Sequence, residues 1–96
     1  MGSVKMRTRT VWTRGINDAV ADDRRMAKAV LSALGRFNRH DWGKLCDEDK
    51  ALNDADLRAR DGRVLAKYPS PQGDMYVIRD FYPDYDLVTV LFCNEY

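Results

Sequence analysis

The chain has 96 residues with a formal net charge of +1, and 45% of the residues are hydrophobic. This is enough apolar material to close one core and too much for a disordered chain, so we expect a single domain over residues 1–96. A domain of this size has little interior left for both a core and a deep pocket, which favours a binding module over an enzyme.

The near-zero total conceals an uneven distribution of charge. Residues 1–44 hold ten Lys or Arg and four acids, whereas residues 45–96 hold six Lys or Arg and eleven acids. The two parts therefore carry +6 and −5. Such a separation either creates local fields that attract charged partners or is neutralised when the two parts fold together, and the residues alone leave both outcomes open.

Residues 1–13 are predicted to form a basic edge strand or an extended arm. The segment from Arg7 to Thr13 is rich in Thr, Val and Trp, which suit a pleated strand. Its alternation is imperfect because Arg7 and Arg9 share a face with Val11. A turn is expected at residues 15–18, where Gly, Asn and Asp gather.

Residues 22–60 are predicted to be helical. The first helix is indicated by an apolar repeat with spacings of four, four and three, formed by Met26, Val30, Leu34 and Phe37 and widened by Ala27, Leu31 and Ala33. The second is expected from about Asp47 to Arg60. It begins with three acids, which suit the positive end of a helix dipole, and has a thinner apolar face with Leu45, Leu52 and Leu57.

Residues 63–96 are predicted to form a β-meander. Its expected strands are 63–68, 75–81 and 87–93, separated by a turn with two prolines and by an acidic, aromatic loop. The last strand is apolar on both faces apart from Thr89, so it is expected to be central. The predicted fold is α+β, with two helices packed on one face of a small antiparallel sheet of three to four strands.

No motif for catalysis, cofactor binding or metal binding is recognised, so we expect no catalytic residue, no cofactor and no metal site. The pair His40 and Asp41 lacks a neighbouring nucleophile, and Cys46 is expected to be a buried structural residue. Cys46 and Cys93 are expected to be free thiols, because no signal peptide or membrane-spanning segment is visible and a reducing cytoplasm is the expected compartment.

Two candidate binding patches remain. The first is the loop with Asp80, Tyr82, Asp84, Tyr85 and Asp86, in which carboxylates alternate with rings that could anchor a protein interface. The alternative is a purely structural role, in which Phe81 and one Tyr belong to the core and the acids keep the loop soluble.

The second candidate patch is the basic segment with Arg7, Arg9, Trp12 and Arg14. Basic side chains beside an aromatic ring could contact a nucleic-acid backbone and stack a base. No recognised nucleic-acid-binding motif accompanies this segment.

Residues 41–96 resemble a family of short, uncharacterised bacterial and phage proteins that are often described only as plasmid-related. The residues that carry the resemblance are Asp41-Trp42-Gly43, Cys46, Glu48-Asp49, Asn53-Asp54, Tyr68, Val77-Ile78, Thr89-Val90-Leu91-Phe92 and Glu95-Tyr96. The chain departs from the family pattern in its loop 82–86, where a short polar turn is usual, and in Cys93, where Pro is common. A changed loop on a shared scaffold is a common way to acquire a new binding function.

Small, charge-polarised proteins of mobile elements also look like anti-CRISPR proteins. This resemblance implies a non-enzymatic inhibitor from a mobile element, acting in the host bacterial cell on a defence complex such as a Cas protein complex. The loop carboxylates would face basic residues of that target. The alternative is a small nucleic-acid-binding accessory protein that uses the basic segment, and an enzyme completed by a partner chain ranks last.

Overall fold

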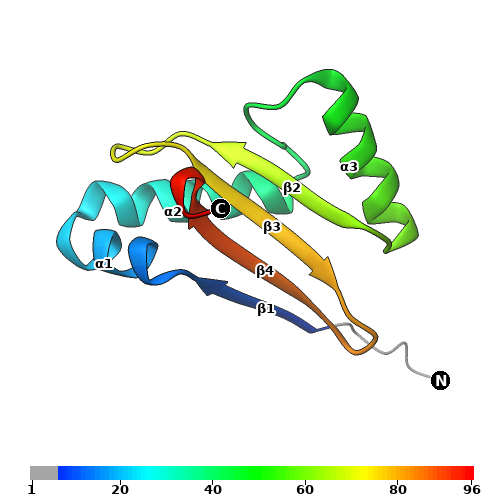
Figure 1. The fold of residues 1–96 in the computed structure, drawn as a ribbon, viewed down its shortest axis with the longest axis horizontal. Coiled ribbons are helices and arrows are strands. Elements are labelled where there is room, and N and C mark those ends of the chain that lie inside the picture. The colour runs from blue at the N-terminus through cyan, green and yellow to red at the C-terminus, as the bar shows by residue number, and fades with distance from the viewer. Residues whose placement is uncertain (1–6) are drawn as a thin grey trace.

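The computed structural model describes residues 7–96, so the first part of the predicted basic arm, including Lys5, lies outside the described residues. The helices follow one another between the first strand and the three remaining strands, which come last in the chain (Figure 1). In chain order the elements are β1 (Arg7–Trp12), α1 (Arg14–Asp22), α2 (Arg24–Asn38), α3 (Asp47–Ala59), β2 (Arg63–Tyr68), β3 (Met75–Phe81), β4 (Tyr85–Phe92) and the 3-10 turn η1 (Cys93–Glu95).

The four strands form one sheet in the order β1-β4-β3-β2, which confirms the α+β class, the edge position of β1 and the interior position of β4. The expectation of a purely antiparallel sheet is wrong, because β1 pairs with β4 in parallel. Only β2, β3 and β4 are joined by hairpins and are antiparallel. Between β1 and β4 lie the helices and two strands, so no hairpin constrains β1 and it can enter the sheet in either direction.

Three helices are present in the described residues instead of the two expected, because the predicted turn at 15–18 is part of α1. The side chain of Thr13 accepts a hydrogen bond from the backbone N–H of Ile16, which caps this helix at its first turn. Ile16 and Ala19 are buried against the rest of the core. Capping and burial therefore outweigh the turn preference of Gly15 and Asn17.

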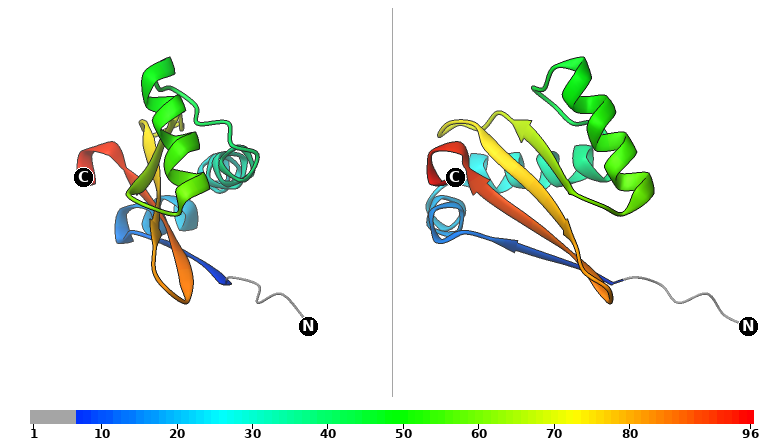
Figure 2. Two further views of the ribbon diagram at one scale, coloured as in Figure 1. Left: turned by 90° about the vertical axis from the view of Figure 1, so that its right-hand side faces the viewer. Right: turned by 45° about the vertical axis from the view of Figure 1, so that its right-hand side comes forward.

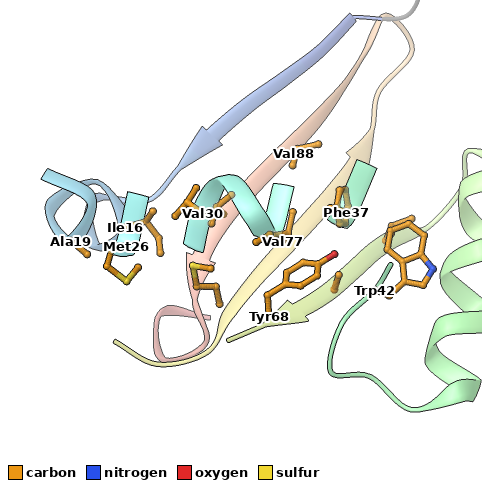
Figure 3. Close-up of a cluster of buried hydrophobic side chains, with 14 residues drawn as sticks. Ile16, Ala19, Met26, Val30, Phe37, Trp42, Tyr68, Val77 and Val88 are labelled. Atoms are coloured by element: carbon orange, nitrogen blue, oxygen red, sulfur yellow. The ribbon is translucent and has the colours of Figure 1, made fainter. Parts of the chain in front are cut away.

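The core lies between α2 and one face of the sheet, as Figure 3 shows. Met26, Val30, Ala33 and Phe37 are buried as the apolar repeat predicts. Leu31, which was expected to widen this stripe, is 69% exposed. It lies at the margin of the stripe, beside the sheet edge formed by β1, where no further element covers it in the part of the chain described.

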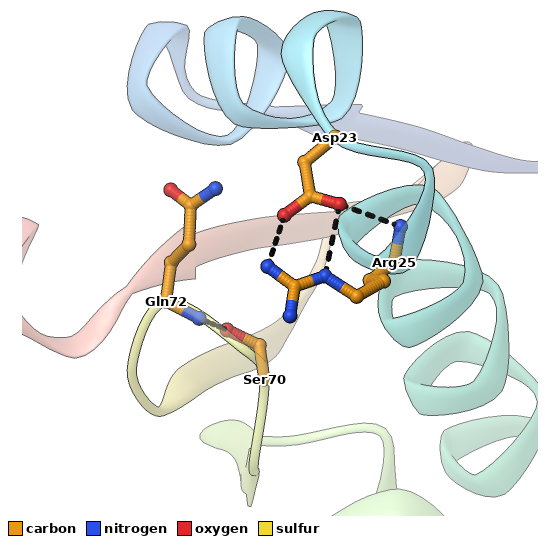
Figure 4. Close-up of polar contacts among 4 residues, drawn as sticks. All are labelled: Asp23, Arg25, Ser70 and Gln72. Carbon is orange, nitrogen blue, oxygen red and sulfur yellow. Dashed lines mark hydrogen bonds and ion pairs between the residues drawn. The ribbon is translucent and has the colours of Figure 1, made fainter.

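The junction of α1 and α2 is fixed by Asp23. Its carboxylate caps α2 by accepting from the backbone N–H of Arg25 at 2.9 Å and also binds the Arg25 guanidinium. Figure 4 shows this pair beside the β2–β3 turn that holds Ser70 and Gln72. Asp23 therefore stabilises the start of the helix that carries the core stripe.

The third helix covers the outer edge of β2 and not a face of the sheet. Figure 2 shows α2 on one sheet face and α3 at the edge. Asn53 of α3 is buried and bonds both backbone groups of Leu65, donating to its carbonyl at 2.8 Å and accepting from its N–H at 3.2 Å. Leu52, which was expected on the apolar face, is 59% exposed. The buried face of α3 was predicted wrongly because a polar residue, Asn53, occupies its buried position.

The loop before α3 closes the rest of the β2 edge. Lys44 N–H donates to the Lys67 carbonyl at 2.8 Å, and Lys67 N–H donates to the Trp42 carbonyl at 3.3 Å. The Trp42 ring is buried and its Nε1 donates to Asp54 at 2.9 Å. Cys46 stands at the N-cap of α3 and is exposed, so its expected burial is wrong.

Several residues of the pattern noted between Asp41 and Tyr96 thus hold the scaffold together. Besides Trp42, Asn53 and Asp54, the buried Tyr68 hydroxyl donates to the Asp41 carbonyl at 2.7 Å. Burial raises the pKa of Tyr68, so this hydroxyl stays protonated and remains a donor. Glu95 accepts from the Thr13 hydroxyl and from the Phe92 backbone N–H, each at 2.8 Å, and so ties η1 to the start of α1.

Two carboxylates should make stability depend on pH. Hydrogen bonds from the Arg36 side chain and from the Gly43 N–H lower the pKa of Asp41 below its ordinary 3.8. Hydrogen bonds from Arg25 do the same for Asp23. Because both pKa values are lower in the folded state, these contacts favour folding above about pH 4 and are lost as pH falls through the lowered values.

We therefore expect the thermal midpoint to drop when the pH is lowered from about 5 to 2. The drop should be modest because Asp41 is exposed and Asp23 is only partly buried, so solvent screens both ion pairs. Circular dichroism melts at stepped pH measure this. The Asp41→Asn variant should show a shallower drop, and an identical pH profile would show that Asp41 contributes nothing to acid sensitivity.

No helix within residues 7–96 combines the length and the apolar character that crossing a bilayer requires.

Candidate functional site

The tip of the β3–β4 hairpin, residues 82–85, presents an ordered pair of aromatic rings. Tyr82 N–H donates to the Tyr85 carbonyl at 2.9 Å and closes the hairpin. The two rings stack with centroids 5.0 Å apart and planes 15° from parallel. Tyr82 is 42% exposed and Asp84 is exposed between the two rings in sequence. The hairpin tip is thus a small projecting surface with rings that are already positioned.

The three carboxylates predicted to act together at this loop have different surroundings. Asp80 lies on β3 and its Oδ1 accepts from Arg63 Nε at 2.8 Å. Asp86 is only 6% exposed and is paired inside the protein. Asp84 is exposed and forms no ion pair with any described residue. The structure therefore leaves one outward carboxylate at the tip, and the other two stabilise the fold.

Arg60, Arg79 and Asp86, here called the Arg60 cluster, form the base on which the hairpin rests. Arg60 Nη1 lies 2.6 Å from Asp86 Oδ1, and Arg79 Nε lies 3.8 Å from Asp86 Oδ2. The first contact is an ion pair by distance but lacks the angle of a hydrogen bond, and Arg79 Nε also has no hydrogen-bond partner among the described residues.

Arg60 reaches the hairpin from the end of α3. It occupies the left-handed cap position of that helix at φ 50°. Its Nη2 donates to the Tyr82 carbonyl at 3.2 Å, and its guanidinium carbon lies 5.2 Å from the centre of the Phe81 ring. One side chain therefore connects α3 with both strands of the hairpin. Nothing in the local sequence around Arg60 indicates this contact, so sequence reasoning missed it.

The basic segment forms the free edge of the sheet, and its functional residues lie on two sides of β1. Arg7 and Arg9 are exposed and pair in register with Tyr85 and Leu87. Trp12 pairs with Val90, which belongs to the helix-covered face, so its ring lies on the opposite side from these arginines. The structure does not bring Arg7, Arg9 and Trp12 onto one face.

Arg14 begins α1, two residues after the end of β1, and among residues 7–96 its one ion-pair contact is a long one with Asp18, at 3.9 Å. The Trp12 indole Nε1 donates to Asn17 at 3.2 Å, which orients the ring toward α1. Trp12 and Arg14 also line a shallow hollow of about 480 Å³, together with Thr10, Val11 and Asn17. This end of β1 therefore has both an exposed ring and a cation.

The two predicted patches adjoin one another. Arg7, the first residue of β1, pairs in register with Tyr85 at the start of β4. Figure 1 shows the beginning of β1 next to the β3–β4 hairpin. The hairpin tip and the β1 edge are therefore parts of one continuous surface at the same end of the sheet.

The charge separation seen in the sequence persists in the fold. Of the ion pairs within residues 7–96, only the one between Lys44 and Asp74 joins the basic part with the acidic part. The others connect residues within one part, as the pairs Arg36–Asp41 and Arg63–Asp80 do. The β1 edge therefore stays basic, while α3 at the far edge keeps its acidic first turn.

Within the described residues, no group of three or more His, Cys, Asp or Glu side chains is placed to hold a metal ion. His40 stacks on the Trp42 ring with centroids 5.5 Å apart. Both Cys46 and Cys93 are free thiols, as expected, and burial raises the pKa of Cys93, which keeps it in the less reactive protonated form.

No family model, curated protein or solved structure matches this chain. The resemblance to plasmid-related and anti-CRISPR proteins therefore stays a prediction.

Proposed function

We propose that this protein is a non-enzymatic binding protein that docks on another protein through the hairpin tip. The observation that carries this proposal is the stacked, partly exposed pair Tyr82 and Tyr85 at the end of a projecting hairpin. Tyrosine rings supply large contact area at a low cost in conformational entropy, and they are enriched at the centres of protein interfaces.

The surroundings of the hairpin tip support a preorganised binding surface. Pro83 restricts the turn, and the Tyr82 carbonyl is held by Arg60. The ring of Tyr85 packs on Tyr82 before any partner arrives. A surface whose rotamers are already restricted loses less entropy on binding, which favours affinity.

As the target we propose a bacterial defence complex such as a CRISPR–Cas complex, and the protein would act as its inhibitor. The support for this class of target is the resemblance of residues 41–96 to short proteins of mobile elements, together with the small size and polarised charge. Asp84 would contact a basic group of the target beside the two rings.

The nucleic-acid alternative is supported by Arg7 and Arg9, which are exposed and have no carboxylate partner among residues 7–96. The position of Trp12 weakens this alternative. A nucleic-acid strand whose phosphates contacted these arginines could not also stack a base on Trp12, because that ring lies on the opposite face of β1. We therefore place protein binding first.

Replacing the outer ring of the hairpin should weaken target binding strongly. The tagged protein is expressed in its bacterial host, and the protein recovered with it is identified by mass spectrometry. We expect Tyr82→Ala to raise the Kd of that complex by about 30-fold, equivalent to about 2 kcal/mol for an interface anchor. Calorimetric titration measures the affinity.

The matched control is Tyr96→Ala, which removes an exposed ring at the opposite end of β4. It should leave the Kd within about twofold of the wild-type value. Equal affinities of Tyr82→Ala and the wild-type protein for the captured target would exclude the hairpin tip as the docking surface.

A further inference from the structure

The two edges of the sheet differ in whether their outward backbone groups are hydrogen-bonded. At the β2 edge, the outward backbone groups of Leu65 and Lys67 are bonded by Asn53, Trp42 and Lys44. At the β1 edge, no such bonds are formed by any described residue. An open strand edge is a template for an added strand, and natural proteins usually protect it. Within residues 7–96, the β2 edge is therefore protected and the β1 edge is open.

The backbone groups that point outward from β1 can be assigned. Thr13 N–H donates to the Val90 carbonyl, so it points toward β4. In a strand, successive residues direct their N–H and C=O groups to opposite sides, so Val11 and Arg9 also point toward β4. Thr8, Thr10 and Trp12 therefore direct their N–H and C=O groups away from the sheet. These groups can bond an added strand.

The outer side of β1 is bordered by an apolar hollow that an added strand could fill. The hollow has a volume of about 160 Å³ and is lined by Trp12, Val20, Ala27, Val30 and Leu31. It lies on the helix side of the sheet and includes two of the most exposed large hydrophobic residues, Trp12 and Leu31. Side chains of an added strand alternate between the two faces, so every second one would point toward this hollow.

The opposite face beside β1 is basic. Arg7 and Arg9 project there, both exposed and without a carboxylate partner among residues 7–96. A strand laid along β1 would thus meet cations on one side and an apolar hollow on the other. Acidic residues alternating with apolar ones complement this arrangement.

We infer that β1 accepts an extended, acidic segment of a partner protein as a fifth strand, with its carboxylates facing Arg7 and Arg9 and its apolar side chains facing the hollow beside Trp12. This inference rests on the proposed function, namely binding to another protein. It adds a second contact surface that adjoins the hairpin tip, since Arg7 pairs with Tyr85. The partner would then contact the tip and the strand edge together.

A second copy of this chain is a poorer occupant of the same edge. Pairing two β1 strands would bring the exposed Arg7, Arg9 and Arg14 of both copies to one seam. Like charges at close range disfavour such pairing, and among the described residues only Asp18 lies near enough to offset one of them, at 3.9 Å from Arg14. An acidic segment brings the opposite charge to the same place.

The test uses the full chain and a synthetic peptide of about eight residues, the length of a short strand, in which Glu and Val alternate. Fluorescence anisotropy of the labelled peptide measures binding. The control is a peptide of the same composition in which all Glu residues come first and all Val residues follow. We expect the alternating peptide to bind at least 10-fold more tightly. We also expect amide exchange at Thr8, Thr10 and Trp12 to slow on binding, while Arg9 and Val11, already bonded to β4, change little.

Two variants locate the contact. Thr10→Pro removes an outward N–H without removing a bond to β4, a position where an edge strand tolerates proline, and should reduce binding at least 10-fold. Arg9→Glu should do the same, whereas Arg58→Glu, an equal charge change on α3, should not. Circular dichroism of each variant checks that it remains folded, and the amide-exchange pattern of the wild-type protein tests the inference without any substitution.

Several outcomes would overturn the inference: no preference for the alternating peptide, binding unchanged in folded Thr10→Pro, a dimer in light scattering that the peptide does not dissociate, or tighter binding to single-stranded DNA than to the peptide. These results concern β1 alone. The affinity of Tyr82→Ala for the captured target tests the hairpin tip, so failure of one surface can be told from failure of the other.

Discussion

Gly43→Ala is expected to destabilise the protein by about 4 kcal/mol, a large part of the 5–15 kcal/mol that usually stabilises a domain. A Cβ atom at this position would lie 2.0 Å from the Lys67 carbonyl oxygen, a contact with backbone that cannot rotate away. The residue also has φ +73°, a conformation that alanine adopts only with strain. The steric overlap and the backbone strain act together. Urea denaturation followed by circular dichroism measures the loss.

The same substitution should open the β2 edge. Relief of the clash requires the loop to move away from Lys67, which breaks the bonds that Lys44 and Trp42 make with it. We expect an increased tendency to self-associate, visible by light scattering, since an unprotected strand edge pairs with other chains.

Gly35→Ala is the matched control for this prediction. Gly35 lies inside α2, and the nearest atom to an added Cβ is 3.6 Å away, on the flexible Arg39 side chain. Alanine is the better helix former there, so the control should be stabilised by about 0.5–1 kcal/mol. A Gly43→Ala variant with the wild-type urea midpoint would show that the contact between this loop and β2 is not rigid.

Elements that depend on local pattern could be predicted from the sequence. The helix with the repeat Met26, Val30 and Phe37 is present, and the strands 63–68 and 75–81 have the expected bounds. In these segments the alternation of apolar and polar residues agrees with the alternation of buried and exposed positions in the fold. The central position of the last strand was also predicted, because an apolar run on both faces fits a strand with neighbours on each side. Its bounds were wrong: β4 runs from Tyr85 to Phe92 and not from 87 to 93, because Tyr85 and Asp86 of the expected loop pair with β1.

Elements that depend on distant partners could not be predicted. In the sequence, Gly15 is typical of a turn. In the structure it lies in α1, where a Cβ atom would be 2.6 Å from the Glu95 carboxylate. Asn53 resembles a solvent-facing helix residue until its amide is seen bonded to Leu65. In both cases the deciding contact comes from a segment far away in sequence, which periodicity does not detect.

The candidate site shows the same limit. The loop composition drew attention to the hairpin, and the structure adds that its rings are stacked and partly exposed. Composition could not distinguish Asp84, which is exposed, from Asp86, which is buried against Arg60. Nor could it show that the basic segment would become a sheet edge next to this hairpin, because that depends on the parallel pairing of β1 with β4.

Asp86→Asn is expected to destabilise the protein by about 3 kcal/mol, because it removes the one carboxylate that balances two guanidinium groups in a largely buried setting. The Asp86 side chain is 9% exposed and that of Arg79 is 15% exposed. Arg79 would be left as a largely buried cation whose Nε already donates to no described residue, and whose guanidinium lies over the Phe37 ring. Asparagine keeps the shape of the side chain, so the loss would report on charge. Urea unfolding measures it.

Asp84→Asn is the matched control. It makes the same chemical change two residues away, at an exposed position without an ion-pair partner among residues 7–96, and should alter stability by less than about 0.5 kcal/mol.

The Arg60 cluster also predicts that the effects of two substitutions on stability are not additive. Arg60→Met should cost less in the Asp86→Asn background than in the wild-type protein, because the carboxylate that Arg60 balances is already absent. Equal costs in the two backgrounds would mean that Arg60 holds the hairpin through the Tyr82 carbonyl and the Phe81 ring, and that the buried charges contribute no coupling of their own.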